Sequence, residues 1–177
     1  MKVGFIGLGI MGTPMALQLL NKGHQLTVHT RRQVPEAITA AGGVRAANAA
    51  AVAKEAEVII TMLPDTPDVE AVLFGEHGVA EGLEGPAGER KVVIDMSSIS
   101  PMATKAFAQR INALGADYVD APVSGGEVGA KAGTLTIMCG GDAAVFQRVK
   151  PLLECMGKNI TLVGGNGDGQ TTKVANQ

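Results

Sequence analysis

The sequence predicts an α/β fold built on a doubly wound parallel sheet, and three observations support this. Short runs of β-branched and other apolar residues alternate with alanine-rich helical stretches through residue 120. These strand runs are apolar almost throughout, which is typical of parallel strands that are buried on both faces. A glycine-rich turn joins the first run to the first helical stretch, where a doubly wound sheet carries its phosphate-binding loop.

The elements can be assigned in order from the apolar runs and the breaks between them. The first strand is predicted at residues 3–6 and the helix after it at 11–21, which Gly23 ends as a C-terminal cap. Ser100, followed by Pro101, is a good cap for a later helix. Further strands are predicted at 26–29, 58–62, 92–95 and 118–120, and further helices at 34–41 and 48–55.

The C-terminal part has a different pattern that predicts extra strands. A strand at 134–139 is followed by a helix at 142–155 and a last strand at 160–163, which extend the sheet. The glycine- and glutamate-rich stretch 75–89 is expected to be a surface loop. Another helix starts near Asp168, but the chain stops at residue 177, so we expect this helix to be truncated.

Composition and charge argue against several classes of protein. The formal net charge is −2 and there is no long basic run, which argues against a nucleic-acid partner. The longest apolar stretches are too short to cross a membrane. The chain has only two cysteines and no disulfide framework, so we expect reduced thiols in a cytoplasmic protein. His24, His29 and His77 share no metal-binding spacing, and we expect no metal site.

The turn after the first strand is a G-x-G-x-x-G pattern, Gly7-Leu8-Gly9-Ile10-Met11-Gly12. In a chain with 24 glycines, a lone pattern of this kind also fits an ordinary turn. Its position between an apolar strand and a helix favours the dinucleotide fingerprint of a Rossmann-type domain. In such a domain Gly7 permits the tight turn, Gly9 lets the backbone approach the pyrophosphate, and Gly12 lets the helix pack closely. We expect residues 1–165 to form this NAD(P)-binding domain and 166–177 to begin an interdomain helix.

The residues that end the second strand bear on the choice of cofactor. They read His29-Thr30-Arg31-Arg32, where an NAD-binding domain usually has an acid for the ribose 2′-hydroxyl. Arginine forks at Arg31 and Arg32 suit a 2′-phosphate instead, so NADP is the predicted cofactor, with NAD as the alternative. A solvated basic turn is the other interpretation of this segment.

Two serine segments follow predicted strands, where ligands of this fold bind. Ser97 and Ser98 end the strand at 92–95, and they could instead serve as helix caps. Ser124 precedes the two glycines at 125 and 126, whose bare backbone N–H groups can hold a carboxylate. A plain glycine turn between two strands is the alternative for that segment.

Four motifs occur together in one order. Besides the glycine loop, they are Asp95-Met96-Ser97-Ser98, Asp120-Ala121-Pro122-Val123-Ser124-Gly125-Gly126-Glu127 and the terminal segment 167–177. In this order and spacing they resemble the β-hydroxyacid dehydrogenases over essentially the whole chain. Glu127, the Met-Ser-Ser-Ile-Ser run from Met96 and the Gly-Asn-Gly-Asp-Gly-Gln run from Gly165 most resemble members that reduce tartronate semialdehyde.

The resemblance implies an NAD(P)H-dependent oxidoreductase that reduces tartronate semialdehyde (2-hydroxy-3-oxopropanoate) to glycerate. Lys173 would be the general acid that protonates the aldehyde oxygen. Asn176 and Gln177, three and four residues further on, share its helix face and would help to bind the substrate. Substrate would also be bound by Ser124, Gly125 and Gly126, and the cofactor would be lined by Met62, Leu63, Pro64, Ser98 and Ile99.

The sequence departs from the family's usual residues at two positions, and two alternative functions stay open. Many members have threonine where Ile99 stands and asparagine where Gln177 stands, so Ile99 can pack on the cofactor but offers no hydroxyl. The family's helical second domain, which completes the pocket and the dimer, is expected to be absent here, so a homo-oligomer is expected only of a longer protein. A lone lysine such as Lys173 is often just a solvated residue. A 3-hydroxyisobutyrate dehydrogenase and a non-catalytic dinucleotide-binding module are the alternatives, and Lys173 together with Ser124 favours an enzyme.

Overall fold

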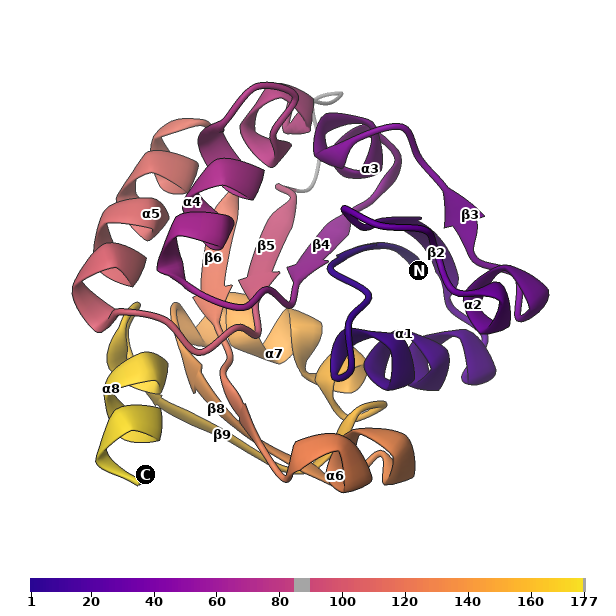
Figure 1. The fold of residues 1–177 in the computed structure, drawn as a ribbon. Coiled ribbons are helices and arrows are strands. Elements are labelled where there is room, and N and C mark those ends of the chain that lie inside the picture. The colour runs from indigo at the N-terminus through magenta and orange to yellow at the C-terminus, as the bar shows by residue number, and fades with distance from the viewer. Residues whose placement is uncertain (85–89, 177) are drawn as a thin grey trace.

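Helices cover both faces of one central sheet in this computed structural model, which describes residues 1–84 and 90–176 (Figure 1). Within the described residues the sheet has nine strands in the order β3-β2-β1-β4-β5-β6-β8-β7, and β9 pairs with β8. The strands are β1 Lys2–Ile6, β2 Gln25–His29, β3 Val44–Arg45, β4 Val58–Thr61, β5 Val92–Asp95, β6 Asp117–Asp120, β7 Val123–Ser124, β8 Leu135–Gly140 and β9 Gly157–Gly164.

The helices alternate with the strands, as the sequence pattern predicts. They are α1 Gly12–Asn21, α2 Glu36–Ala40, α3 Ala49–Glu55, α4 Thr66–Phe74, α5 Pro101–Ala113, α6 Gly126–Ala132, α7 Ala143–Leu153, α8 Asp168–Ala175 and the 3-10 helix η1 Val79–Gly82. Local capping explains several starts, because the side chains of Asn48, Ser100 and Asp142 accept hydrogen bonds from the first turns of α3, α5 and α7. The predicted cap at Ser100 is therefore confirmed.

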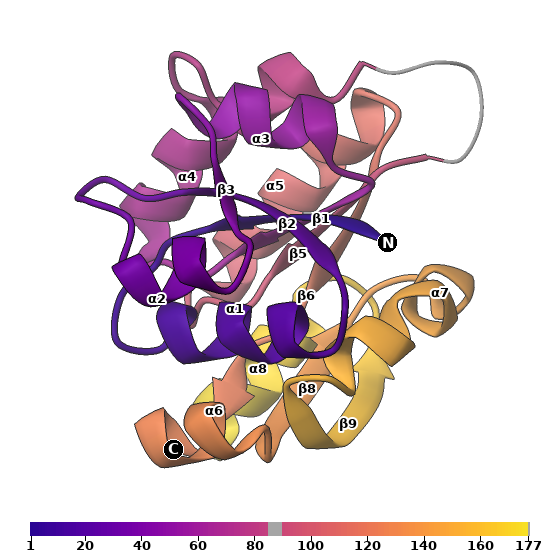
Figure 2. The same cartoon turned by 90° about the vertical axis from the view of Figure 1, so that its right-hand side faces the viewer.

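Two apolar cores lie on opposite faces of the sheet. On β4, Val58 and Ile60 belong to one core and Ile59 to the other, because successive side chains of a strand point to opposite faces. The first core also contains Met15 of α1, and the second contains Val52 of α3. Figure 2 shows α3, α4 and α5 above the sheet and α1 below it. This two-sided cover confirms the predicted doubly wound architecture.

The C-terminal extension joins the sheet in the opposite direction. Strands β1 to β6 are parallel to their neighbours, whereas β8 runs antiparallel to β6 and to β7. β9 then runs parallel to β8. The predicted extra strands are confirmed, and their reversed direction is a feature that the strand pattern did not predict.

The stretch predicted as a surface loop at 75–89 is partly a packed element. Val79 is fully buried in η1, and a Cβ atom at Gly82 would lie 2.2 Å from the carbonyl oxygen of Ala50. The prediction was wrong for this part because η1 covers α3 and contributes to its core. Residues 85–89 of that stretch lie outside the described residues. No helix among the described residues is long and apolar enough to cross a membrane.

Candidate active site

The glycine loop joins β1 to α1, and its three glycines meet different surroundings. Gly7 has a φ of +104°, and a Cβ atom there would lie 2.1 Å from the carbonyl oxygen of Met62. A Cβ atom at Gly12 would lie 1.8 Å from the carbonyl oxygen of Gly7. At Gly9 a Cβ atom would meet nothing within 4 Å. Gly7 is thus needed for the tight turn and Gly12 for close packing, whereas Gly9 leaves the backbone exposed at the start of α1.

The rest of the loop is held against the end of β2. The backbone N–H of Gly7 donates to the carbonyl of His29 at 3.0 Å, and that of Leu8 donates to the hydroxyl of Thr30 at 3.3 Å. Leu8 is buried and Met11 is half-buried, whereas Ile10 is 73% exposed. The structure therefore brings Thr30 beside the glycine loop, as a shared dinucleotide site requires.

Arg31 is paired with an acid that the local sequence does not contain. Its Nη2 atom lies 2.6 Å from Oδ1 of Asp68, which stands in the first turn of α4. Arg31 remains 79% exposed in this pair, and Arg32 is also exposed. No acid stands in the four residues that directly follow β2, yet the fold supplies one from α4. Asp68 is a site residue that sequence analysis missed, and a separation of 37 residues left no local signal for it.

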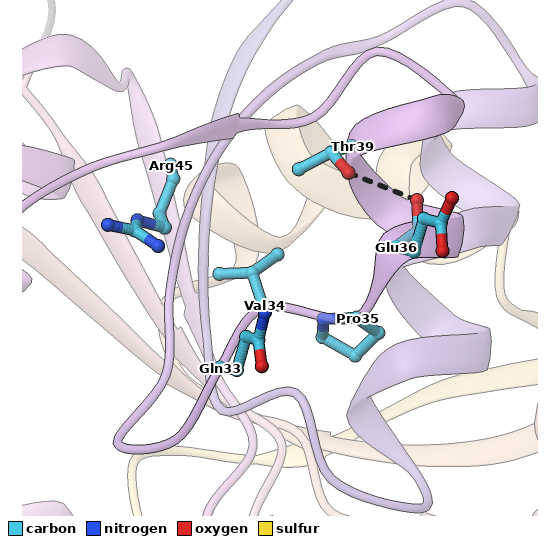
Figure 3. Close-up of a pocket in the computed structure, with 6 residues that line it drawn as sticks. All are labelled: Gln33, Val34, Pro35, Glu36, Thr39 and Arg45. Carbon is cyan, nitrogen blue, oxygen red and sulfur yellow. Dashed lines mark hydrogen bonds between the residues drawn. The ribbon is translucent and has the colours of Figure 1, made fainter.

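Two small cavities flank the segment after β2. One, of about 240 Å³, is lined by Thr30, Arg32 and Arg45 among others. The second, of about 560 Å³, is shown in Figure 3, where Val34 lies between Arg45 and Pro35. In the second cavity the hydroxyl of Thr39 donates to the carbonyl of Glu36 at 3.0 Å. Both cavities share Arg45 of β3, a cation to which sequence analysis gave no role.

The loops after β4 and β5 are tied together at the carboxyl end of the sheet. The N–H of Leu63 donates to Oγ of Ser97 at 2.8 Å, and Ser97 is fully buried. Pro64 and Ser98 are exposed, whereas Ile99 is only 6% exposed and packs in the core on the α5 side of the sheet. Met62 and Leu63 are half-buried. Ser97 therefore links the two loops by a hydrogen bond, and little of the Ile99 side chain is accessible to a ligand.

Two of the predicted catalytic and substrate-binding residues, Lys173 and Ser124, meet at the β7 end of the sheet. Nζ of Lys173 on α8 donates to Oγ of Ser124 on β7 at 2.7 Å. The next two residues, Gly125 and Gly126, have φ angles of +130° and +60° and are exposed. Nδ2 of Asn176 lies 3.9 Å from Sδ of Met138. Gln177 is outside the described residues.

Two buried carboxylates support these loops, and sequence analysis gave neither a role. Asp95 accepts hydrogen bonds from the Thr61 hydroxyl at 2.9 Å and from the Ser97 N–H at 3.1 Å. Burial raises the pKa of Asp95 to about 6, although these hydrogen bonds oppose the rise. Burial likewise raises the pKa of Asp120, against the N–H groups of Gly167 and Gln170. Each aspartate ends a parallel strand, which was the available signal.

Metal ligands do not gather in this region or elsewhere in the part of the chain that the structure describes. No group of three or more His, Cys, Asp or Glu side chains is placed there to hold a metal ion.

Comparisons with known proteins agree with this geometry. Residues 2–165 match the NAD binding domain of 6-phosphogluconate dehydrogenase. A 2-hydroxy-3-oxopropionate reductase of Escherichia coli (strain K12) is 60% identical over 178 aligned positions, which cover 100% of this chain and 59% of that protein. A 3-sulfolactaldehyde reductase of the same organism is 43% identical, over 98% of this chain and 57% of that protein.

Solved structures show the same fold. The 3-hydroxyisobutyrate dehydrogenase of Mycobacterium tuberculosis with L-serine superposes with a TM-score of 0.89 at 35% identity, covering 99% of this chain and 58% of that one. A protein named Psf3, in complex with NADP+ and 2-OPP, has a TM-score of 0.89 at 31% identity, covering 98% of this chain and 61% of that one. This chain thus spans well under two thirds of each of these proteins. It belongs to the family of the NAD binding domain of 6-phosphogluconate dehydrogenase, and its relatives are β-hydroxyacid dehydrogenases.

Proposed function

We propose that this chain is the nucleotide-binding part of an NAD(P)H-dependent tartronate semialdehyde reductase. The observation that carries the proposal is the 2.7 Å contact between Nζ of Lys173 and Oγ of Ser124. This contact places a proton donor next to a candidate binding site for the substrate carboxylate. The chain is also 60% identical to a 2-hydroxy-3-oxopropionate reductase. A non-catalytic dinucleotide-binding module is the alternative function, but such a module would not require a lysine at position 173.

The residues around the glycine loop fit a dinucleotide. Gly9 is exposed and has open space where a side chain would stand, so a pyrophosphate can reach the backbone at the start of α1. Thr30 is held beside the loop, and the loops at 62–64 and 97–99 lie at the same edge of the sheet. A nicotinamide dinucleotide bound here would supply the hydride for carbonyl reduction.

The protein's own groups then have separate tasks in the reduction. The aldehyde carbon receives the hydride, and its oxygen needs one proton to become the alcohol of glycerate. The Lys173 ammonium carries that proton, and general acid assistance is worth roughly 10²–10⁴-fold in rate. Ser124 and the N–H groups of Gly125 and Gly126 hold the substrate carboxylate, so the aldehyde is presented to Lys173 in one orientation.

Three narrower points belong to the same proposal. NADP is preferred to NAD, because Arg31, Arg32 and Arg45 gather around the end of β2. The free thiols of Cys139 and Cys155 are compatible with a cytoplasmic location. The small hydroxyacid or semialdehyde is the partner, and a homo-oligomer forms through a helical domain outside this chain.

A second substrate has some support. The 3-hydroxyisobutyrate dehydrogenase of M. tuberculosis has the same fold at 35% identity. The ligand of that structure, L-serine, is a small hydroxyl-bearing acid like glycerate. We therefore expect 3-hydroxyisobutyrate to be the next best substrate of the full-length protein, meaning the complete gene product with any residues beyond Gln177.

A substrate panel tests the proposal. The full-length protein is assayed by nicotinamide absorbance with tartronate semialdehyde and, in the oxidative direction, glycerate and 3-hydroxyisobutyrate, with both cofactors. We expect the highest kcat/KM for tartronate semialdehyde with NADPH. The chain ending at Gln177 should bind the dinucleotide but turn over slowly. Turnover of 3-hydroxyisobutyrate in preference to glycerate would replace the first function with the second.

A further inference from the structure

The last helix, α8, is capped by a side chain from a distant strand. Its N-cap residue, Gly167, has no side chain to offer, and no side-chain cap comes from that position. The buried carboxylate of Asp120, at the end of β6, instead accepts the N–H of Gly167 at 2.9 Å and that of Gln170 at 3.2 Å. These donors are 47 and 50 residues away from Asp120. Asp120 therefore does from the sheet what an N-cap residue does locally.

Gln170, in the first turn of α8, ties the helix to the loop after β5. Its side chain is 1% exposed. Its Oε1 atom accepts the N–H of Ile99 at 3.1 Å, and its Nε2 atom donates to the carbonyl of Ser97 at 2.7 Å. The Ser97 hydroxyl accepts the N–H of Leu63 at 2.8 Å, so the chain of bonds continues to the loop after β4.

This network determines where Lys173 can be. A helix as short as α8, with eight residues, is marginal by itself, because most helix stability comes from tertiary packing. Lys173 follows Gln170 by three residues and so lies on the same side of the helix, one turn further on. The bonds of Asp120 and Gln170 fix the axial position and rotation of that turn. In that position Nζ of Lys173 reaches Oγ of Ser124 at 2.7 Å.

We propose that Asp120 and Gln170 are positioning residues for the reaction, and that Gln170 couples the lysine helix to the two loops that border the dinucleotide. The inference rests on the proposed function. Its physical basis is that proton transfer requires hydrogen-bond distance, and a misplacement of about 1 Å can cost on the order of 10²-fold in rate. A merely structural role would affect folding and all ligands together, whereas a positioning role affects turnover selectively.

The test uses Gln170→Met in the full-length protein, because methionine keeps the side-chain length but makes neither hydrogen bond. We expect kcat to fall about 10- to 100-fold, with KM for the semialdehyde and the Kd of NADPH within about threefold of wild type. A deuterium isotope effect from deuterated NADPH should rise in this variant, since the reduction itself becomes slow. Thr171→Ala is the matched control, because it removes one hydrogen bond within α8, from the Thr171 hydroxyl to the Gly167 carbonyl, but none to the loop after β5. It should leave kcat, the isotope effect and the Kd of NADPH within about twofold of wild type.

A second readout needs neither cofactor nor turnover. Competitive acylation of lysines, read by mass spectrometry, should label Lys173 more slowly than exposed Lys158 in wild type. In Gln170→Met the labelling of Lys173 should rise toward that of Lys158. If Gln170→Met does not fold, Asp120→Asn, which retains one acceptor oxygen, is measured in the same way.

The outcomes separate the two proposals. An inactive wild type with the labelling change present would overturn the proposed function and leave the positioning role intact. An active wild type whose Gln170→Met variant matches Thr171→Ala in kcat and labelling would overturn the positioning role alone. So would a variant in which kcat, NADPH affinity and the unfolding temperature all fall together.

Discussion

Nζ of Lys173 lies 2.7 Å from Oγ of Ser124, although 49 residues separate them in the chain. An ammonium group can only donate, so the Ser124 oxygen accepts in this contact. The hydroxyl proton of Ser124 is then directed away from Lys173 and is available to a substrate oxygen. The contact therefore fits the proposed division of tasks, with Ser124 for substrate binding and Lys173 for proton transfer.

Ser124→Ala should separate these tasks. The variant loses a hydrogen bond to a carboxylate, and such bonds are worth about 1.5–3 kcal/mol, so KM should rise roughly 10- to 100-fold. The Kd of the dinucleotide should stay within a few-fold, because four strands separate β7, which carries Ser124, from β1, which leads into the glycine loop. Steady-state kinetics and calorimetry measure the two quantities. An unchanged KM in a folded variant would mean that the carboxylate binds elsewhere.

Gly9→Ala and Gly12→Ala should have opposite consequences. A Cβ atom at Gly9 meets no atom within 4 Å, so the free energy of unfolding should change by less than about 0.5 kcal/mol. The same methyl group obstructs the pyrophosphate, so dinucleotide binding should weaken by about tenfold or more. A Cβ atom at Gly12 would lie 1.8 Å from the Gly7 carbonyl oxygen, so that variant should be destabilised by about 1–3 kcal/mol or more. Urea unfolding and calorimetry distinguish the two. Normal NADPH binding by Gly9→Ala would contradict the proposed cofactor site.

The Arg31–Asp68 pair gives a test of cofactor preference. The carboxylate of Asp68 competes with a 2′-phosphate for Arg31, and a surface pair of this kind holds by only about 0–1 kcal/mol. Asp68→Asn should therefore increase the preference for NADPH over NADH by up to about fivefold, and Arg31→Ala should decrease it by roughly 3- to 30-fold. Calorimetric titration of both cofactors gives the ratio. If neither variant shifts that ratio, Arg31 takes no part in the choice.

Asp95 should make stability depend on pH. Its folded-state pKa of about 6 is above the ordinary value of 3.8, so the folded protein binds an extra proton between these values. The stability that this proton confers is fully present below pH 3.8 and is lost as the pH rises through 6, by up to roughly 3 kcal/mol. Asp95→Asn should abolish this loss. Urea unfolding at pH 5 and 7 for both proteins measures it, and parallel pH dependences would contradict the raised pKa.

Much of the fold could be predicted because its signals are local. The β1–turn–α1 unit is encoded by consecutive residues, and the requirement for Gly12 follows from a backbone contact within that unit. The same is true of the helix starts at Asn48, Ser100 and Asp142. Elements with short or mixed patterns, such as β3, β7, α4 and α6, were not predicted.

The features that could not be predicted depend on pairings across the sheet. Asp68 reaches Arg31 from α4, and Gln170 reaches the loop after β5 from 71 residues away. The antiparallel direction of β8 beside β6 is set by packing, since an alternation of apolar residues carries no strand direction. The sequence singled out Lys173 and Ser124, which the structure brings into contact, whereas the contacts of Asp68, Gln170 and the buried aspartates needed the three-dimensional fold.

The most direct test of the account is Lys173→Ala in the full-length protein, compared with wild type in single-turnover reduction of tartronate semialdehyde at saturating NADPH. The lysine supplies only the proton, so the rate of nicotinamide oxidation should fall about 10²–10⁴-fold while the Kd of NADPH stays within a few-fold. A Lys173→Ala rate within tenfold of wild type would contradict the account, because another group would then be the acid.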